Sequence, residues 1–201
     1  MSGGANPVGP PAMAPIAQQR IGDFLAALAA RTPTPGGGAV AGSTLATAAA
    51  LGRMVLAFTI GKPRFAEHAA THQDAERRLA DWQVALLDLA DADATAYHAL
   101  NAAQRLPSDA PGRNALPALL IAATEPPLRM AEAAHDMQAL LEGLRANTNP
   151  HLGSDLAIAI DLARCGRRAA LHNVHANLPL VDERSRGGLA ARAARVSDAT
   201  E

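Results

Sequence analysis

Aromatic residues are nearly absent from this chain of 201 residues, in which phenylalanine, tryptophan and tyrosine together make up 2%. Side chains that favour strands are scarce, and the apolar share of 49% comes mainly from alanine and leucine. Alanine and leucine are the strongest apolar helix formers, and small side chains let helix axes approach closely. The composition therefore predicts an all-α protein of tightly packed helices.

The chain also contains little cysteine and has a net charge close to zero. The single cysteine, Cys165, excludes an internal disulfide and fits a reducing compartment, so a cytoplasmic location is expected. A formal net charge of −1 without a basic tail argues against a nucleic-acid partner. The first fifteen residues have no basic region and no continuous apolar core, which excludes a secretory signal.

One apolar stretch, residues 39–60, is long enough to span a bilayer and carries only one charge, Arg53. Its apolar character comes mostly from alanine, with glycine, serine and threonine between, so we expect a soluble protein without a membrane partner. A helix that is apolar on nearly every side must be surrounded by protein. This helix is expected at the centre of the bundle or at the seam of a dimer.

Proline and glycine divide the chain into a flexible tail (1–18), one helical domain (19–182) and a short terminal helix with a frayed end (183–201). The sequence predicts a single-domain bundle of five to six helices. A very long central helix of about 60 Å is expected over 65–105, which contain no proline or glycine. Another helix, over 113–145, is expected to kink or break at Pro126 and Pro127. A further helix should begin with Ser154 as its N-cap.

Three consecutive glycines follow Pro35 directly before the apolar helix. Gly36, Gly37 and Gly38 allow the backbone to approach a ligand, and free N–H groups at a helix start attract an anion or a carbonyl. A tight turn between helices accounts for the same residues equally simply. The segment lacks the lysine of a phosphate-binding Walker loop and the preceding strand of a dinucleotide-binding fold.

Two charged segments are candidates for chemistry. Lys62 and Arg64 follow the apolar helix, where they either cap its C-terminus or bind a carboxylate. Asp88 and Asp91 lie three residues apart on one helix face, whereas Asp93 points elsewhere. A carboxyl group buried among leucine and alanine has a raised pKa that suits proton transfer. Solvated carboxylates on an exposed helix face are the alternative.

Histidine spacing does not predict a metal site. His68 and His72 are four residues apart, but Ala69 stands where a zinc protease has its glutamate. His172 and His175 lack a convincing third ligand. We therefore expect no metal.

Five segments, taken in order between Ile21 and Asp182, resemble the formiminotetrahydrofolate cyclodeaminase and methenyltetrahydrofolate cyclohydrolase family. Each segment is weak alone, but five in register with matching spacing are specific. The segments are FLAALAARTPTPGGGAVAG, FTIGKPRF, LADADATAYHALNAAQRLP, RNALPALLIAATEPPL and NPHLGSDLAIAIDLARCGRRAALHNVHANL.

The resemblance implies a homodimeric helical enzyme that binds a tetrahydrofolate derivative between subunits or helices, with no metal or prosthetic group. It also implies that Asp93 is the catalytic acid or base. The remaining residues that match the family's motifs are expected to bind the substrate: Pro35, Gly36, Gly37, Gly38, Lys62, Arg64, Asn149, Ser154, Asp155, Asn173 and Asn177.

Two reactions fit this resemblance. The first is hydrolysis of 5,10-methenyltetrahydrofolate to 10-formyltetrahydrofolate, favoured because the chain carries no formiminotransferase domain that would supply a deaminase. The alternative is a formiminotetrahydrofolate cyclodeaminase, which releases ammonia. A non-catalytic folate-binding relative is the second alternative, suggested by the short loop at 107–112 and the short C-terminus.

Overall fold

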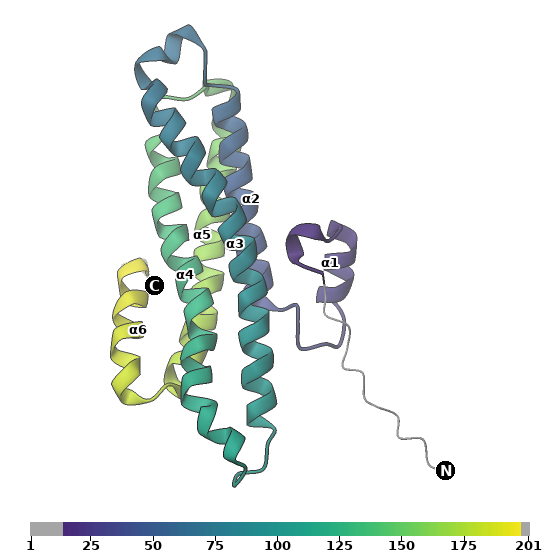
Figure 1. The fold of residues 1–201 in the computed structure, drawn as a ribbon. Coiled ribbons are helices and arrows are strands. Elements are labelled where there is room, and N and C mark those ends of the chain that lie inside the picture. The colour runs from purple at the N-terminus through teal and green to yellow at the C-terminus, as the bar shows by residue number, and fades with distance from the viewer. Residues whose placement is uncertain (1–13, 198–201) are drawn as a thin grey trace.

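The computed structural model of this chain describes residues 14–197, which form six α-helices and no strand. Four long helices make an up-down-up-down bundle, and two short helices flank it (Figure 1). The predicted all-α bundle is confirmed. The α-helices are α1 (Ile21–Leu28), α2 (Gly37–Ala57), α3 (Ala69–Gln104), α4 (Leu116–Gly143), α5 (Gly153–Asn177) and α6 (Glu183–Val196).

Short 3₁₀ turns connect the helices. The turns η2 and η4 lie at one end of the bundle, and η3 and η5 lie at the other (Figure 1). The 3₁₀ turns are η1 (Ile16–Gln18), η2 (Pro63–His68), η3 (Pro111–Ala115), η4 (Pro150–Leu152) and η5 (Leu178–Leu180).

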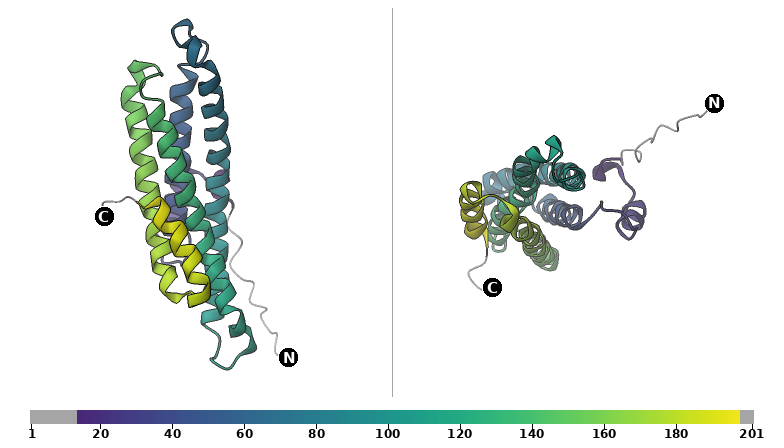
Figure 2. Two further views of the ribbon diagram at one scale, coloured as in Figure 1. Left: turned by 90° about the vertical axis from the view of Figure 1, so that its left-hand side faces the viewer. Right: turned by 90° about the horizontal axis from the view of Figure 1, so that it is seen from below.

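The four long helices stand at the corners of a square, as the end view in Figure 2 shows. Helix α2 packs mainly on α3 and α5, and α4 packs on the same two helices from the opposite corner. Alanine and leucine fill the space between them, including the fully buried Leu45, Leu79, Leu128 and Ile160. Small residues bring the axes close, since a Cβ on Gly42 would lie 2.7 Å from the Cβ of Ala90.

Helix α2 is the predicted apolar helix, and it begins two residues earlier than expected, because Gly37 and Gly38 are its first residues. Among the described residues it is the one helix long and apolar enough to cross a membrane, and 56% of that stretch is buried inside the bundle. Eleven of its 21 residues are buried. The other side of α2, which includes Val40, stays open, and so does Phe58 directly after the helix.

Helix α3 contains 36 residues, which corresponds to a length of about 54 Å. It is the predicted long helix, shortened at its start because Pro63–His68 form a 3₁₀ turn instead. The predicted break in the next helix does not occur. Helix α4 continues through Pro126 and Pro127, both of which are buried.

Helix α6 is fastened to α4 by Arg192. Its guanidinium donates to Glu125 (2.8 and 2.9 Å) and to Glu132 (two bonds of 2.8 Å). Arginine suits this role because its planar fork can engage two carboxylates at fixed angles. Leu189, Ala193 and Val196 bury the inner side of the same helix. The predicted terminal helix is thus part of the core, and residues 198–201 lie outside the described chain.

Helix α1 stands beside the bundle without substantial contact with the other described elements (Figures 1 and 2). None of its residues is buried, although Ile21 and Leu25 are apolar and are 80% and 54% exposed. The flexible tail expected over 1–18 is shorter at its inner end, because Ile16–Gln18 form the turn η1 against α3. Residues 1–13 of that expected tail lie outside the described residues.

Candidate active site

A cavity of about 320 Å³ opens beside the start of α2 and the last turns of α5. Helices α2, α3, α4 and α5 all contribute to it, together with the segment that precedes α2. Its lining consists of Pro33, Thr34, Gly36, Gly37, Gly38, Ala39, Asp93, Ala94, Tyr97, Ala123, Asn173, Ala176 and Asn177.

Asp93 is the only ionisable carboxyl group in this lining. It projects from α3 onto the first turn of α2, so that a Cβ added to Gly38 would lie 1.9 Å from its Oδ2 atom. Burial raises the pKa of Asp93 from 3.8 to about 6, because desolvation disfavours the charged form. A carboxyl group with this pKa exchanges a proton readily near neutral pH. Asp93 is half-buried, which favours the partly buried alternative over a fully solvated carboxylate.

The start of α2 supplies hydrogen-bond donors beside this carboxyl group. The first bond within the helix runs from the N–H of Val40 to the carbonyl of Gly36. The N–H groups of Gly37, Gly38 and Ala39 therefore have no carbonyl partner inside the helix, and all three residues line the cavity. A helix N-terminus of this kind favours a carbonyl or anionic oxygen of a ligand.

Asn173 supplies a further donor. Its Nδ2 atom is buried and makes no hydrogen bond within residues 14–197. Its Oδ1 atom lies against the backbone of Gly37, 3.3 Å from the position that a Cβ would take there. A buried amide N–H without a partner costs about 1–3 kcal/mol, which a ligand that accepts this hydrogen bond recovers.

The side chain of Asn177 is held by a backbone carbonyl of α4 that a proline leaves without its partner in the helix. Pro127 has no N–H to donate to the carbonyl of Ala123, the residue four positions before it. The Nδ2 of Asn177 donates to that carbonyl at 3.1 Å. This bond crosses from α5 to α4 and fixes the side chain of Asn177 at the cavity wall.

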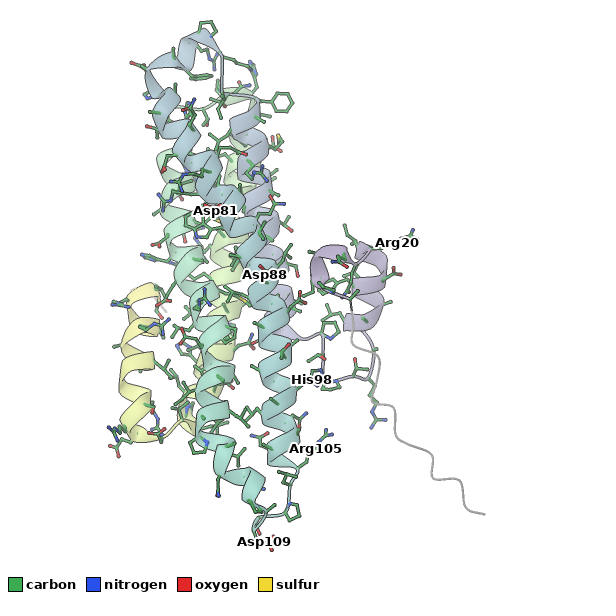
Figure 3. The ribbon with its side chains drawn as sticks, in the orientation of Figure 1. Arg20, Asp81, Asp88, His98, Arg105 and Asp109 are labelled. Atoms are coloured by element: carbon green, nitrogen blue, oxygen red, sulfur yellow. The ribbon has the colours of Figure 1, made fainter. Side chains whose placement is uncertain are left out.

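The segment before α2 is tied to α3. The hydroxyl of Thr34 and the Nε2 atom of His98 form a hydrogen bond. In Figure 3, His98 lies on α3 at the level of the segment that joins α1 to α2. Tyr97, one residue before His98 and one turn after Asp93, lines the cavity and is 45% exposed. The spacing of four residues from Asp93 could have predicted Tyr97, whereas Thr34 and Ala123 carry no signal in the sequence.

The other acids of this region do not reach the cavity. Asp91 accepts the N–H of Ile16 at 3.3 Å and so holds η1 against α3. Desolvation is the largest cause that raises the pKa of Asp91. Asp88 lies on the outer surface of α3 in Figure 3. The predicted separation of Asp93 from the Asp88–Asp91 face is confirmed.

Five of the eleven expected substrate-binding residues lie at the far end of the bundle. Lys62 and Arg64 follow the far end of α2, about 30 Å along the helix from Gly37. Asn149, Ser154 and Asp155 lie at that same end, before and within the first turn of α5. These five residues therefore do not line the Asp93 cavity of their own chain. That they bind a folate held between subunits or helices stays a prediction.

Three smaller corrections follow from the backbone. Pro35 is buried in a cis Thr34–Pro35 peptide bond and supports the loop without lining the cavity. Ser154 does not cap α5, because the helix already begins at Gly153. Asn149 instead caps η4 by accepting the N–H of His151, and its own N–H donates to Thr59.

Metal-binding groups do not gather within the described part of the chain. No three side chains of histidine, cysteine, aspartate or glutamate lie close enough there to hold an ion. The ring centroids of His68 and His72 are 5.9 Å apart at the far end of the bundle. The cavity offers one carboxyl group, two carboxamides, a tyrosine and backbone N–H groups, which suits proton transfer and hydrogen bonding to a polar organic ligand.

Comparison with known proteins identifies relatives over most of the chain. The family described as formiminotransferase-cyclodeaminase matches residues 20–195. A methenyltetrahydrofolate cyclohydrolase of Methylorubrum extorquens is 31% identical over 172 residues, which cover 83% of this chain and 83% of that protein. The likeness therefore extends over most of both chains.

The names of two further relatives state a different activity, that of a cyclodeaminase. A formimidoyltransferase-cyclodeaminase of Sus scrofa is 33% identical over 160 residues, which cover 77% of this chain and only 30% of that longer protein. The crystal structure of a formiminotetrahydrofolate cyclodeaminase from Thermotoga maritima superimposes with a TM-score of 0.84 at 26% identity, covering 90% of this chain and 89% of that chain.

Proposed function

Because this chain belongs to the formiminotransferase-cyclodeaminase family, we propose that it is a folate-dependent one-carbon enzyme that hydrolyses 5,10-methenyltetrahydrofolate to 10-formyltetrahydrofolate. The observation that carries the proposal is the cavity around Asp93, a half-buried carboxyl group with a pKa of about 6 beside N–H groups that have no partner within α2. The cyclohydrolase relative, matched over 83% of its length, favours hydrolysis over the other reaction of the family.

In this reaction the substrate is a cyclic amidinium cation and water is the nucleophile. Ionised Asp93 stabilises the cation and takes a proton from water as the new C–O bond forms. The hydroxyl of the resulting carbinolamine then loses its proton to solvent as the C=O bond forms and the bond from that carbon to N5 breaks, and Asp93 returns its proton to N5. One proton is released in total, and 10-formyltetrahydrofolate is the product. The chain's own residues suffice for these steps, so no prosthetic group is proposed.

The cyclodeaminase reaction is the second candidate, because the Thermotoga maritima structure named for it matches over 89% of its length. That reaction closes a formimino group onto the neighbouring nitrogen and expels ammonia, which requires a proton donor. Asp93 serves this step in its protonated form. A non-catalytic folate binder accounts less well for a carboxyl group packed so closely against Gly38.

The dependence of rate on pH separates the two reactions. With Asp93 as a base, kcat/KM for methenyltetrahydrofolate should rise as pH increases through about 6, where the carboxyl group ionises. With Asp93 as a proton donor, kcat/KM for 5-formiminotetrahydrofolate should fall through the same pH. Absorbance assays of both substrates between pH 5 and 8 measure this directly. A rate that shows no inflection near pH 6 with either substrate contradicts the role of Asp93.

A homodimer in the cytoplasm is part of the proposal. The open side of α2 exposes Val40 and Phe58, which are 37% and 55% accessible. Helix α1, with Ile21 and Leu25 exposed, lies on that side of the bundle (Figures 1 and 2). Apolar side chains of this size on two neighbouring helices are typical of a surface that a second copy covers.

Substitution of Phe58 tests the dimer. Light scattering of the unaltered chain should give twice the monomer mass of 20.7 kDa. Phe58→Glu places a charge in the proposed interface and should shift the mass to that of a monomer at micromolar concentration. Val84→Glu, at a position 62% exposed on α3, is the matched control and should remain dimeric. A monomeric mass for the unaltered chain contradicts the proposal.

A further inference from the structure

Tyr97 is the one aromatic residue in the lining of the Asp93 cavity, and the reaction described above gives it no role. The whole chain contains three phenylalanines, one tryptophan and one tyrosine, so a ring in this lining is unusual for the chain. Apart from Asp93 and Tyr97, the lining consists of glycine, alanine, proline, threonine and asparagine. Any contact of a ligand with an aromatic ring in this cavity is therefore a contact with Tyr97.

The ring of Tyr97 lies on the same face of α3 as the carboxyl group of Asp93. The two residues are four positions apart, and both line the cavity together with Ala94. Long side chains in a helix lean toward its N-terminus, over the residues three and four positions before them. Tyr97 therefore leans toward Ala94 and Asp93, and the small side chain of Ala94 leaves room for a ligand beside the ring. Tyr97 is 45% exposed, so the ring is accessible to that ligand.

The walls of the cavity differ in electrostatic character. The start of α2 and the Nδ2 atom of Asn173 present N–H donors, which suit a carbonyl oxygen and disfavour a positive charge. Helix α3 presents the ring of Tyr97 next to the carboxyl group of Asp93, and both groups attract a cation. The lining residues, all within 14–197, include no lysine, arginine or histidine that would repel one. A ligand with a carbonyl group and a separate positive charge therefore has one favourable orientation.

We propose that Tyr97 determines the preference of the site for the cationic substrate over the neutral product, by packing its ring against the amidinium ring of 5,10-methenyltetrahydrofolate. The inference rests on the proposed function, because it takes that cation as the ligand of the cavity. The quadrupole of an aromatic ring attracts a cation placed over its face, and the attraction grows where water is displaced. In this orientation the carbonyl group of the pterin faces the N–H donors of α2 and Asn173.

The contact with Tyr97 should act on substrate binding and not on the rate of the chemical step. Addition of water neutralises the amidinium, so the attraction to the ring is strongest before the reaction and absent in 10-formyltetrahydrofolate. An interaction that weakens toward the transition state lowers KM without raising kcat. Tyr97→Leu should therefore raise KM for methenyltetrahydrofolate about tenfold and leave kcat nearly unchanged.

Calorimetry with the full chain tests the preference without depending on turnover. Asp93→Asn serves as the background, because it stops hydrolysis and leaves Tyr97 in place. The two ligands are methenyltetrahydrofolate, a cation, and 5-formyltetrahydrofolate, which is neutral at its one-carbon group. We expect the addition of Tyr97→Leu to lower the preference for the cation, measured as the ratio of the two dissociation constants, about tenfold. Tyr97→Phe is the matched control, because it keeps the ring and should change the ratio by less than about twofold.

Other outcomes overturn the inference. A ratio that survives Tyr97→Leu, including the case in which both ligands are weakened equally, leaves the ring a packing role only. A ratio that falls as far in Tyr97→Phe assigns the preference to the hydroxyl group. If the ratio falls as expected but the unaltered chain does not hydrolyse methenyltetrahydrofolate, the proposed function fails and the cation site stands. If neither ligand binds, both fail.

Discussion

Asp93→Asn is expected to lower kcat for methenyltetrahydrofolate hydrolysis by roughly 10²–10⁴-fold, the range that general acid–base catalysis contributes. Asparagine keeps the shape and the hydrogen-bonding capacity of the side chain but cannot accept the proton of water. The assay follows the loss of substrate absorbance against the spontaneous rate in the same buffer. An Asp93→Asn variant that keeps more than a tenth of the activity contradicts the proposed role.

The same variant should fold at least as well as the unaltered chain, which distinguishes lost chemistry from lost structure. Asp93 has a pKa of about 6 when folded and 3.8 as the reference value, so the folded state binds its proton more tightly. Ionisation of Asp93 therefore lowers the free energy of unfolding as pH rises from about 4 to 6. Above pH 6, Asp93→Asn should be more stable by up to about 3 kcal/mol, and near pH 4 by little. Urea titrations at pH 4 and pH 8 measure the difference.

Gly38→Ala is expected to lower activity on the order of 10²-fold by displacing the same carboxyl group. The new Cβ would lie 1.9 Å from Oδ2 and 2.4 Å from Cγ of Asp93, so the side chain or the start of α2 must move. The carboxyl group of Asp93 then moves away from the N-terminus of α2, although the residue itself is unchanged. The signature is a fall in kcat together with an altered pH profile, because a displaced carboxyl group is less buried.

Two comparisons test whether this effect is specific. Gly143→Ala adds a methyl group where nothing lies within 4 Å, so it should leave activity intact. Gly36→Ala meets only the carbonyl of Pro33, at 3.8 Å, and should reduce activity far less than Gly38→Ala. Equal losses in Gly36→Ala and Gly38→Ala would show that flexibility of the loop matters, and not the packing of Gly38 on Asp93.

The sequence was sufficient to predict the helices because their signals are local. The alanine and leucine periodicity of α2 and the long proline-free run of α3 determine these elements wherever they pack. Asp93 was singled out by the family resemblance, because its small apolar neighbours alone did not distinguish partial burial from an exposed helix face. The distance of Lys62 and Asn149 from Asp93 could not be predicted, because it depends on the direction of each helix in the bundle, which no short motif encodes.

The break considered at the double proline of α4 is absent for a different reason. A proline in a helix removes a donor, and from the sequence nothing indicates whether another group replaces it. The replacement comes from Asn177, on a different helix and 54 residues from Ala123. A side-chain bond across such a separation depends on tertiary packing, so only the structure reveals it.

The hydrogen bond from Asn177 to the carbonyl of Ala123 couples the choice of residue at one position of α4 to the choice at one position of α5. Pro127 is absent from the cavity lining, yet the hydrogen that it lacks determines where Asn177 must point. An ancestor that exchanged Pro127 for alanine would satisfy the Ala123 carbonyl from within its own helix and release the amide to turn towards the ligand. A change of substrate preference could therefore begin with a residue that no ligand touches, and positions 127 and 177 should be inherited as a pair.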